Sequence, residues 1–221
     1  MIKVDDSSVQ KLLNWADENS IPELTWVQHD SYLKGGYFKG LPREKEKLLE
    51  LKELNLLGFQ LSTLPKELGV LSSLQKLYLT GNQIEELPIE IGDLLSLKEL
   101  YIPGNKLSTL PKSIGKLTNL TAIYLQENRL TQLPSEIGSL VNLSILELGA
   151  NKLEVLPLEI ANLTNLTKLT LWKNQLTELP NGIEKLLNLQ ELDFVYNKVK
   201  LTNANVEWLE KLIKQDCEIT L

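Results

Sequence analysis

The sequence has very few of the residues on which most chemical sites depend. Among its 221 residues, cysteine and histidine occur once each, as Cys217 and His29, and arginine occurs twice, as Arg43 and Arg129. A single cysteine excludes a disulfide within the chain. One cysteine with one histidine also excludes a Cys/His metal cage, which usually needs about four ligands. The motifs G-x-x-x-x-G-K-S/T, G-x-G-x-x-G and G-x-S-x-G are absent as well. We therefore expect no catalytic, metal-ligating or cofactor-binding residues.

The charge balance narrows the class of partner. The formal net charge is −6, with 23 basic and 29 acidic residues, whereas proteins that bind nucleic acid gather Arg and Lys against the phosphates. No stretch is apolar enough to span a bilayer, and residues 1–6 contain no apolar secretory core. The lone thiol suits a reducing compartment. We expect a cytoplasmic monomer that binds neither nucleic acid nor membrane.

What the sequence does contain is leucine, at 51 positions, in a strict repeat. A Leu-Pro pair recurs every 23 residues, and the repeat holds seven of the nine prolines. The prolines of these pairs are Pro42, Pro65, Pro88, Pro111, Pro134, Pro157 and Pro180. Six full units follow the pattern LxxLxLxxNxLxxLPxxIxxLxx over residues 51–188, and Leu or Ile fills all 42 of their apolar slots. A period of this length is typical of a solenoid.

This pattern resembles the leucine-rich repeat proteins, in the 23-residue class found in bacterial and Ras-suppressor-like proteins. The resemblance covers roughly residues 41–200. It implies an α/β fold, a right-handed leucine-rich repeat solenoid with a curved parallel sheet on its concave face and helical caps at both ends. We expect one continuous domain, built of an N-terminal cap and degenerate repeat (1–50), six repeats (51–188), and a partial seventh repeat with a C-terminal cap (189–221).

The physical chemistry of one unit agrees with this expectation. In LxxLxL, the last two leucines alternate with period two and so lie on one face of a short strand. The Leu-Pro step favours a turn over a long helix on the return path. The asparagine slot holds Asn82, Asn105, Asn128, Asn151, Asn174 and Asn197, and we interpret this ladder as structural, because a buried amide can satisfy backbone groups that a tight turn leaves unpaired. Phe59 replaces it in the first unit, where we expect apolar packing against the cap.

The two ends depart from the repeat. We expect an amphipathic helix over residues 6–19, with a capping box of Ser7 and Gln10 and an apolar stripe of Val9, Leu12, Leu13 and Ala16. In residues 23–50, Leu33, Phe38, Leu41, Pro42 and Leu48 keep the repeat phase, and residues 32–38 predict a turn between extended pieces. At the other end we expect a helix over about 203–214 with Val206, Leu209 and Ile213 on one face, a buried Cys217, and a final strand over 218–221.

The outward-facing strand positions are the surface that remains for recognition. Across neighbouring strands, three consecutive tyrosines would stand about 4.8 Å apart, and exposed Tyr and Trp are favoured interface anchors. The candidate partner-binding residues of this concave face are Tyr78, Tyr101, Tyr124, Glu147, Trp172, Lys173, Asp193 and Tyr196. Small residues beside them, at Gly58, Gly81, Gly104, Gly149 and Ala150, would leave room for a partner.

The sequence thus favours a non-enzymatic scaffold that binds a protein or peptide ligand on its concave face, as this family usually does. Three alternatives stay open. The chain could be an inhibitor or regulatory subunit of an enzyme, or a secreted bacterial effector or ligand acting on a host protein. An enzyme with a site of carboxylates alone would need two acids with raised pKa, which an open face does little to provide.

Overall fold

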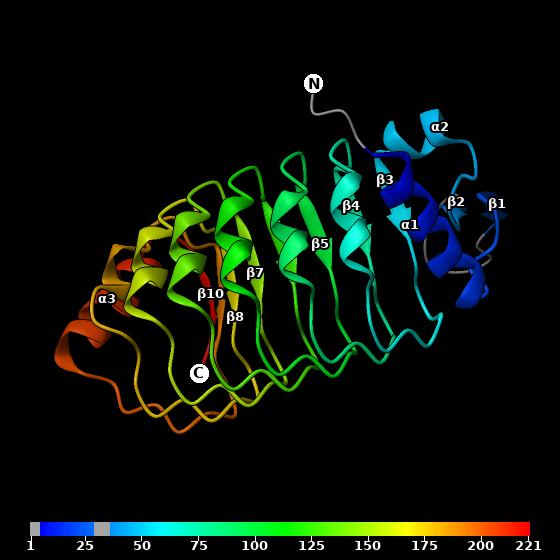
Figure 1. Ribbon diagram of the computed structural model, residues 1–221. Helices are drawn as coiled ribbons and strands as arrows, with labels where there is room; N and C mark the ends of the chain where they lie inside the picture. The colour runs from blue at the N-terminus through cyan, green and yellow to red at the C-terminus, as the bar shows by residue number, and fades with distance from the viewer. Residues whose placement is uncertain (1–4, 29–35) are drawn as a thin grey trace.

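The computed structural model describes residues 5–28 and 36–221 as an elongated, gently curved stack of similar units (Figure 1). Each unit contributes a three-residue strand to a parallel eight-stranded sheet of order β10-β9-β8-β7-β6-β5-β4-β3. The strands are β3 (Glu53–Asn55), β4 (Lys76–Tyr78), β5 (Glu99–Tyr101), β6 (Ala122–Tyr124), β7 (Ile145–Glu147), β8 (Lys168–Thr170), β9 (Glu191–Asp193) and β10 (Glu218–Thr220). This sheet is the concave face of an α/β solenoid.

The strands pair in the register that the repeat predicts. Leu77, Leu100 and Ile123 are aligned across β4, β5 and β6, and each is fully buried. Their neighbours in each strand point to the opposite face, because side chains alternate along a strand. The same slot of every unit therefore forms one continuous row on the concave surface.

The opposite side of the stack consists of short 3-10 turns. They are η1 (Lys66–Val70), η2 (Ile89–Asp93), η3 (Lys112–Lys116), η4 (Ser135–Ser139), η5 (Leu158–Asn162) and η6 (Ile183–Lys185). In the first five turns the repeated proline precedes the turn in extended conformation, for instance Pro111 with φ −68° and ψ 146°. The expected turn in place of a long helix is confirmed. The turns pack closely: a Cβ at Gly138 would lie 2.5 Å from the Glu159 backbone carbonyl.

One continuous hydrophobic core runs between these two layers. Of the 42 apolar slots, all are buried except that of Leu51, which is partly buried against the same core. At roughly 2 kcal/mol per buried Leu or Ile side chain, burial is the main stabilising contribution. A single unit cannot bury its own apolar face, so the stability of each unit depends on its neighbours.

The asparagine ladder is structural, as expected. The Oδ1 atom of Asn105 accepts from the Ile84 amide at 3.0 Å, and its Nδ2 donates to the Leu79 carbonyl at 2.9 Å. The other five asparagines repeat both contacts, each with its own preceding unit. Both backbone groups belong to the preceding unit, so each asparagine links its own unit to the one before it.

Helix α1 (Asp6–Glu18) packs at the N-terminal end of the core (Figure 1). Its buried residues Val9, Leu12 and Ala16 lie on the stripe that the sequence indicates. The predicted capping box is wrong: the N-cap is Asp5, two residues before Ser7, and its side chain accepts from the amide of Ser7. Ser7 already lies inside the helix, whereas Asp5 has the extended backbone, φ −69° and ψ 131°, that an N-cap residue adopts.

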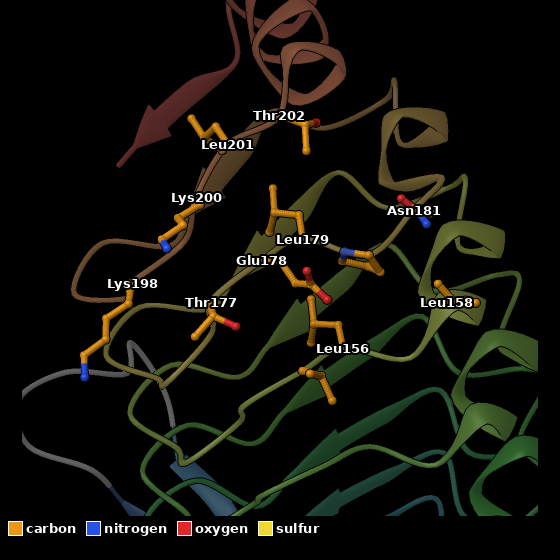
Figure 2. A pocket seen from close by; sticks show the side chains of 12 residues that line it. Leu156, Leu158, Thr177, Glu178, Leu179, Asn181, Lys198, Lys200, Leu201 and Thr202 are labelled. Carbon is orange, nitrogen blue, oxygen red and sulfur yellow. The ribbon is translucent and has the colours of Figure 1, made fainter.

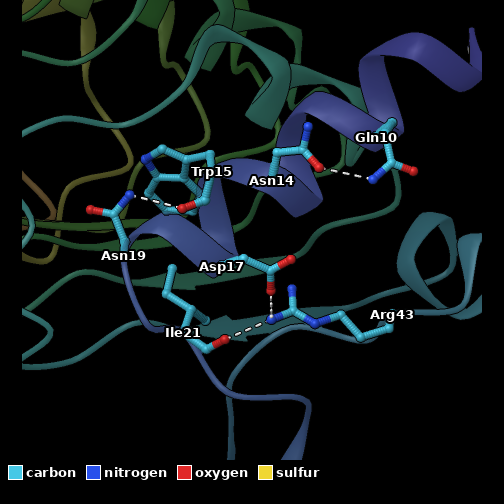
Figure 3. A network of polar contacts seen from close by, with 7 residues as sticks. All are labelled: Gln10, Asn14, Trp15, Asp17, Asn19, Ile21 and Arg43. Carbon is cyan, nitrogen blue, oxygen red and sulfur yellow. Dashed lines mark hydrogen bonds and ion pairs between the residues drawn. The ribbon is translucent and has the colours of Figure 1, made fainter.

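A network of polar contacts ties α1 to the chain that follows (Figure 3). The Arg43 guanidinium lies 2.7 Å from the Asp17 carboxylate and donates to the Ile21 carbonyl at 2.8 Å. One of the two arginines thus has a structural role.

The N-terminal degenerate repeat is an antiparallel pair, β1 (Thr25–Gln28) and β2 (Gly36–Lys39), followed by the short helix α2 (Lys45–Leu49). Leu41 and Leu48 are buried as expected, but Phe38 is 54% exposed. Leu33, His29 and most of the turn predicted over 32–38 lie outside the described residues. Phe59 packs partly buried against the core, with the Lys39 ammonium 4.3 Å from its ring centre.

Helix α3 (Asn203–Ile213) lies at the C-terminal end and presents a different face from the predicted one. Leu209 is buried, but Val206 and Ile213 are 43% and 59% exposed. The buried stripe is instead Asn205, Trp208, Leu209 and Leu212. The indole of Trp208 brings the largest apolar area and donates to the Leu186 carbonyl at 3.2 Å, which sets the rotation of the helix.

Cys217 follows this helix and is buried, as expected. Burial raises the pKa of its thiol above the usual value, and nearby Glu191 and Glu218 add to this. The thiol therefore stays protonated and unreactive near neutral pH. The predicted final strand is β10, which pairs in parallel with β9.

Candidate functional site

Three tyrosines form a stack across the N-terminal half of the concave sheet. The rings of Tyr78 and Tyr101 lie 4.6 Å apart at 14°, and those of Tyr101 and Tyr124 lie 4.4 Å apart at 5°. Each side chain is partly exposed. We call Tyr78, Tyr101 and Tyr124 the tyrosine stack. It offers one flat, rigid, amphipathic surface whose side chains have already lost most of their conformational freedom.

The hydroxyl groups of the stack are held in the neutral form. Tyr101 donates to a Glu99 carboxylate oxygen at 2.5 Å. Burial among its neighbours, and after it this hydrogen bond, raises the pKa of Tyr101 well above the usual value. Burial likewise raises the pKa of Tyr78 and Tyr124. At physiological pH the stack therefore presents uncharged hydroxyl groups.

Ion pairs flank the tyrosine stack on both sides. Lys76 lies 3.1 Å from Glu99, and Lys168 lies 2.9 Å from Glu147 and 3.1 Å from Glu191. The hydrogen bond with Glu147 is the main cause of a raised pKa at Lys168. The candidate residue Glu147 is thus already paired, so it cannot offer a free charge to a partner without releasing this lysine.

The indole of Trp172 covers Gly149 of the preceding unit. A Cβ built on Gly149 would fall 2.0 Å from the Trp172 Nε1 atom. The sequence-based idea that Gly149 leaves room for a partner is therefore wrong, because the indole ring of the same protein occupies that room. Gly58 and Gly81 do face open space, but their φ angles of 72° and 67° show that the turn itself favours glycine there.

Two polar atoms near this ring lack a hydrogen-bond partner among the described residues. They are Gln126 Oε1 and Thr170 Oγ1, both fully covered by neighbouring atoms. Gln126 occupies the same row as Gly149 and Trp172, and Thr170 lies two residues before Trp172. Buried polar groups are nearly always paired, so these atoms make the surroundings of Trp172 an unusual part of the sheet.

Lys173 and Tyr196 belong to a different row from the other candidates. They occupy the turn directly after the strand, with φ of 53° and 58°. This left-handed slot holds Gly58, Gly81 and Gly104 in the first three units and Glu127, Ala150, Lys173 and Tyr196 in the last four. A side chain there costs about 1 kcal/mol relative to glycine. Tyr196 is 77% exposed, and both residues stand at the edge of the sheet, apart from the tyrosine stack.

Asp193 has a local structural contact. One of its carboxylate oxygens accepts from the Val195 amide at 3.0 Å, as Asn55 does for Leu57 at the other end of the sheet. The structure thus brings together Tyr78, Tyr101, Tyr124 and Glu147, which is aligned with Tyr124 on the next strand. Trp172, Lys173, Asp193 and Tyr196 lie further along the solenoid.

A hollow of about 820 Å³ lies beside the last units, where sequence reasoning indicated nothing (Figure 2). Its lining includes buried Leu156 and Leu179 and exposed Leu158. Lys198 and Lys200 lie at one end, and Leu158 and Asn181 at the other. The sequence signal that could have indicated it is apolar Val155, Leu158 and Leu201 in slots that are exposed.

Residues 5–28 and 36–221 hold no group of three or more His, Cys, Asp or Glu side chains suited to a metal ion. Within the same residues, no helix is long and apolar enough to cross a membrane.

Comparison with known proteins agrees with the fold. The family model of the leucine-rich repeat region matches residues 42–128 and 123–215. No curated protein sequence matches the chain.

Two solved structures illustrate the similarity. A leucine-rich repeat protein of Leptospira interrogans is 35% identical with a TM-score of 0.61, over 79% of this chain and 51% of that one. The leucine-rich repeat ectodomain of the Arabidopsis thaliana receptor kinase GASSHO1/SCHENGEN3, in complex with CASPARIAN STRIP INTEGRITY FACTOR 2, is 30% identical with a TM-score of 0.65. That match covers 71% of this chain and 20% of the ectodomain. The chain thus spans about half of one relative and a fifth of the other. With its repeats, its parallel sheet and these matches, the chain belongs to the leucine-rich repeat family.

Proposed function

We propose that this protein is a non-enzymatic scaffold that binds a segment of a partner protein on its concave face. The observation that carries the proposal is the tyrosine stack, whose rings are aligned at 4.6 and 4.4 Å and remain partly exposed. A surface of this kind loses little conformational entropy when a partner covers it. Large aromatic side chains of this type dominate the binding energy of many interfaces.

The polar groups around the stack support recognition in preference to chemistry. The pKa of Tyr101 is raised, so its hydroxyl stays neutral and can form hydrogen bonds. The carboxylates nearest to it are paired with lysines, as in Lys76 with Glu99. These carboxylates are engaged within the protein, whereas general acid or base catalysis needs a group placed to exchange a proton with a substrate.

The relatives support the same class of function. The receptor-kinase ectodomain that matches this chain was solved in complex with CASPARIAN STRIP INTEGRITY FACTOR 2, which shows that a solenoid of this family can hold a second component. With the lone thiol buried and protonated, we propose that the protein works as a monomer in a reducing compartment, the cytoplasm. A role as inhibitor or regulatory subunit would use the same surface.

An affinity capture from native lysate, read by mass spectrometry, tests the proposal. The concave variant Tyr101→Ala/Tyr124→Ala/Trp172→Ala is compared with wild type and with the convex variant Ile89→Ala/Leu95→Ala/Val141→Ala, which removes apolar side chains exposed on the far side of the solenoid. Circular dichroism establishes that each variant is folded. We expect proteins that wild type and the convex variant retain and the concave variant loses. Equal retention by all three would refute the concave site.

A further inference from the structure

A row of cations runs along one edge of the sheet, beside the asparagine ladder. The residue after each ladder asparagine is Lys106, Arg129 and Lys152 in three consecutive units. Their backbone amides donate to the carbonyls of Ile84, Leu107 and Leu130 in the preceding units, each at 2.9 Å. Because these bonds repeat unit by unit, the three cations are held at successive steps of the same edge.

A fourth cation joins this row from the neighbouring slot. Arg129, Lys152 and Lys173 line a shallow hollow of about 360 Å³ whose other walls include the buried amides Asn128 and Asn151. Lys173 stands in the left-handed slot that is glycine in the first three units. We call Lys106, Arg129, Lys152 and Lys173 the basic edge.

Among the described residues, the cations of the basic edge have no acidic partner. Within the described residues, Arg129, Lys152 and Lys173 form no ion pair, and Lys106 donates only to the Gln83 side chain at 3.0 Å. By contrast, Lys76 and Lys168 of the sheet and Lys112 and Lys116 of the convex turns all lie against carboxylates. One acid, Glu127, lines the same hollow. Neither Glu127 nor nearby Glu154 forms an ion pair in the described part of the chain. Four cations thus face two acids in a protein of net charge −6.

We infer that the basic edge binds an acidic segment, rich in Asp or Glu, of the partner that the concave face holds. This inference rests on the proposed function and names the chemistry of that partner. Alternate side chains of an extended segment lie about 6.6 Å apart on one side. Successive units place the cations on the order of 5 Å apart, within reach of long, flexible Lys and Arg side chains. A nucleic acid fits less well, because its phosphates continue beyond the four cations and over a protein of net charge −6.

Fluorescence anisotropy with defined probes tests this inference. The probes are a labelled peptide of alternating Glu and Ser, its Gln and Ser counterpart, and a labelled oligothymidylate. The edge variant is Arg129→Gln/Lys152→Gln/Lys173→Gln. The control, Lys11→Gln/Lys211→Gln/Lys214→Gln, removes the same charge from exposed lysines of the two end helices. We expect wild type and control to bind the Glu peptide, and the edge variant to bind it about tenfold more weakly. Binding should weaken at about 0.15 M salt, where charges are screened beyond ~8 Å.

Several results would overturn the inference. The inference fails if wild type does not bind the Glu peptide or binds the Gln peptide equally well. It fails too if the control variant loses as much affinity as the edge variant, or if wild type binds the oligothymidylate more tightly than the Glu peptide. The edge variant is also carried through the lysate capture. If it retains the proteins that the concave variant loses, the basic edge is not part of the partner surface. If the edge variant loses proteins that the concave variant retains, the concave site fails and the basic edge stands.

Discussion

The N-terminal and C-terminal halves of the solenoid share a backbone and differ in what they place on it. In the first three units, glycine fills the left-handed slot and tyrosines line the sheet from Tyr78 onward. In the last four, side chains fill that slot, and Trp172 lies on Gly149. The hydrophobic core runs through both halves, and so does the asparagine ladder from the second unit onward. The repeated core and ladder therefore stabilise the fold, which leaves the outward-facing side chains of the sheet available for binding.

The largest expected effect concerns the ladder that the halves share. We expect Asn105→Ala and Asn151→Ala to lower the free energy of unfolding by about 2–4 kcal/mol each, because each change leaves several buried backbone groups without partners. Urea denaturation measures both. The control Asn165→Ala removes one exposed hydrogen bond, to the Val141 carbonyl, and should cost less than about 1 kcal/mol. If the two substitutions lowered the free energy of unfolding by clearly unequal amounts, the two halves would differ in their buried packing as well.

The next effect separates the halves at Trp172. We expect Gly149→Ala to drive the indole off the sheet, since the new Cβ would lie 2.0 Å from Nε1, at a cost of roughly 1–2 kcal/mol in lost packing. Acrylamide quenching of tryptophan fluorescence should increase. Gly81→Ala, where nothing lies within 4 Å, should leave quenching as in wild type. Unchanged quenching in Gly149→Ala would mean that Trp172 does not rest on Gly149 in solution.

An exchange in the left-handed slot should give a smaller effect of opposite sign in the two halves. Gly104→Lys is expected to destabilise by about 1 kcal/mol, because φ is 66° there. Lys173→Gly, with φ of 53°, should relieve a similar strain and raise stability by up to about 1 kcal/mol, less the flexibility that glycine adds to the unfolded chain. Thermal unfolding compares the two. Destabilisation by Lys173→Gly would indicate that the lysine makes a stabilising contact.

The smallest effect concerns ionisation of the tyrosine stack. Because the folded pKa of Tyr101 is raised above its unfolded value, its contribution to stability is present below about pH 10 and is lost as the pH rises through the folded value. Titration of tyrosinate absorbance should show a step delayed beyond the ordinary range that Tyr101→Phe removes. Phe59→Leu, outside the stack, serves as the folding control and should keep the step. A titration unchanged by Tyr101→Phe would contradict the raised pKa.

Much of the molecule could be predicted from the 23-residue pattern. The buried slots, the parallel register, the ladder and the tyrosine row all follow from it, since each unit repeats the same local geometry. The ends were harder. Helix α3 carries two apolar stripes. The stripe with Trp208 is buried, and Val206 and Ile213 of the other stripe are exposed. The N-cap of α1 is Asp5, whereas the sequence pattern predicted Ser7.

The site residues divide in the same way. Neighbouring strands place Tyr78, Tyr101 and Tyr124 side by side, so their stacking was foreseeable from one slot of the repeat. The pairing of Glu147 with Lys168 depends on which rotamers two long side chains adopt together. The position of Trp172 depends likewise on the direction in which its ring turns.

The order of residues alone was enough for the fold, because periodic burial of Leu and Ile leaves one way to stack the units. Three features arise only between units. They are the indole that occupies the space over Gly149, the hollow beside Leu156 and Leu179, and the unpaired basic edge. They depend on contacts between side chains that are more than twenty residues apart, and no local pattern encodes those contacts.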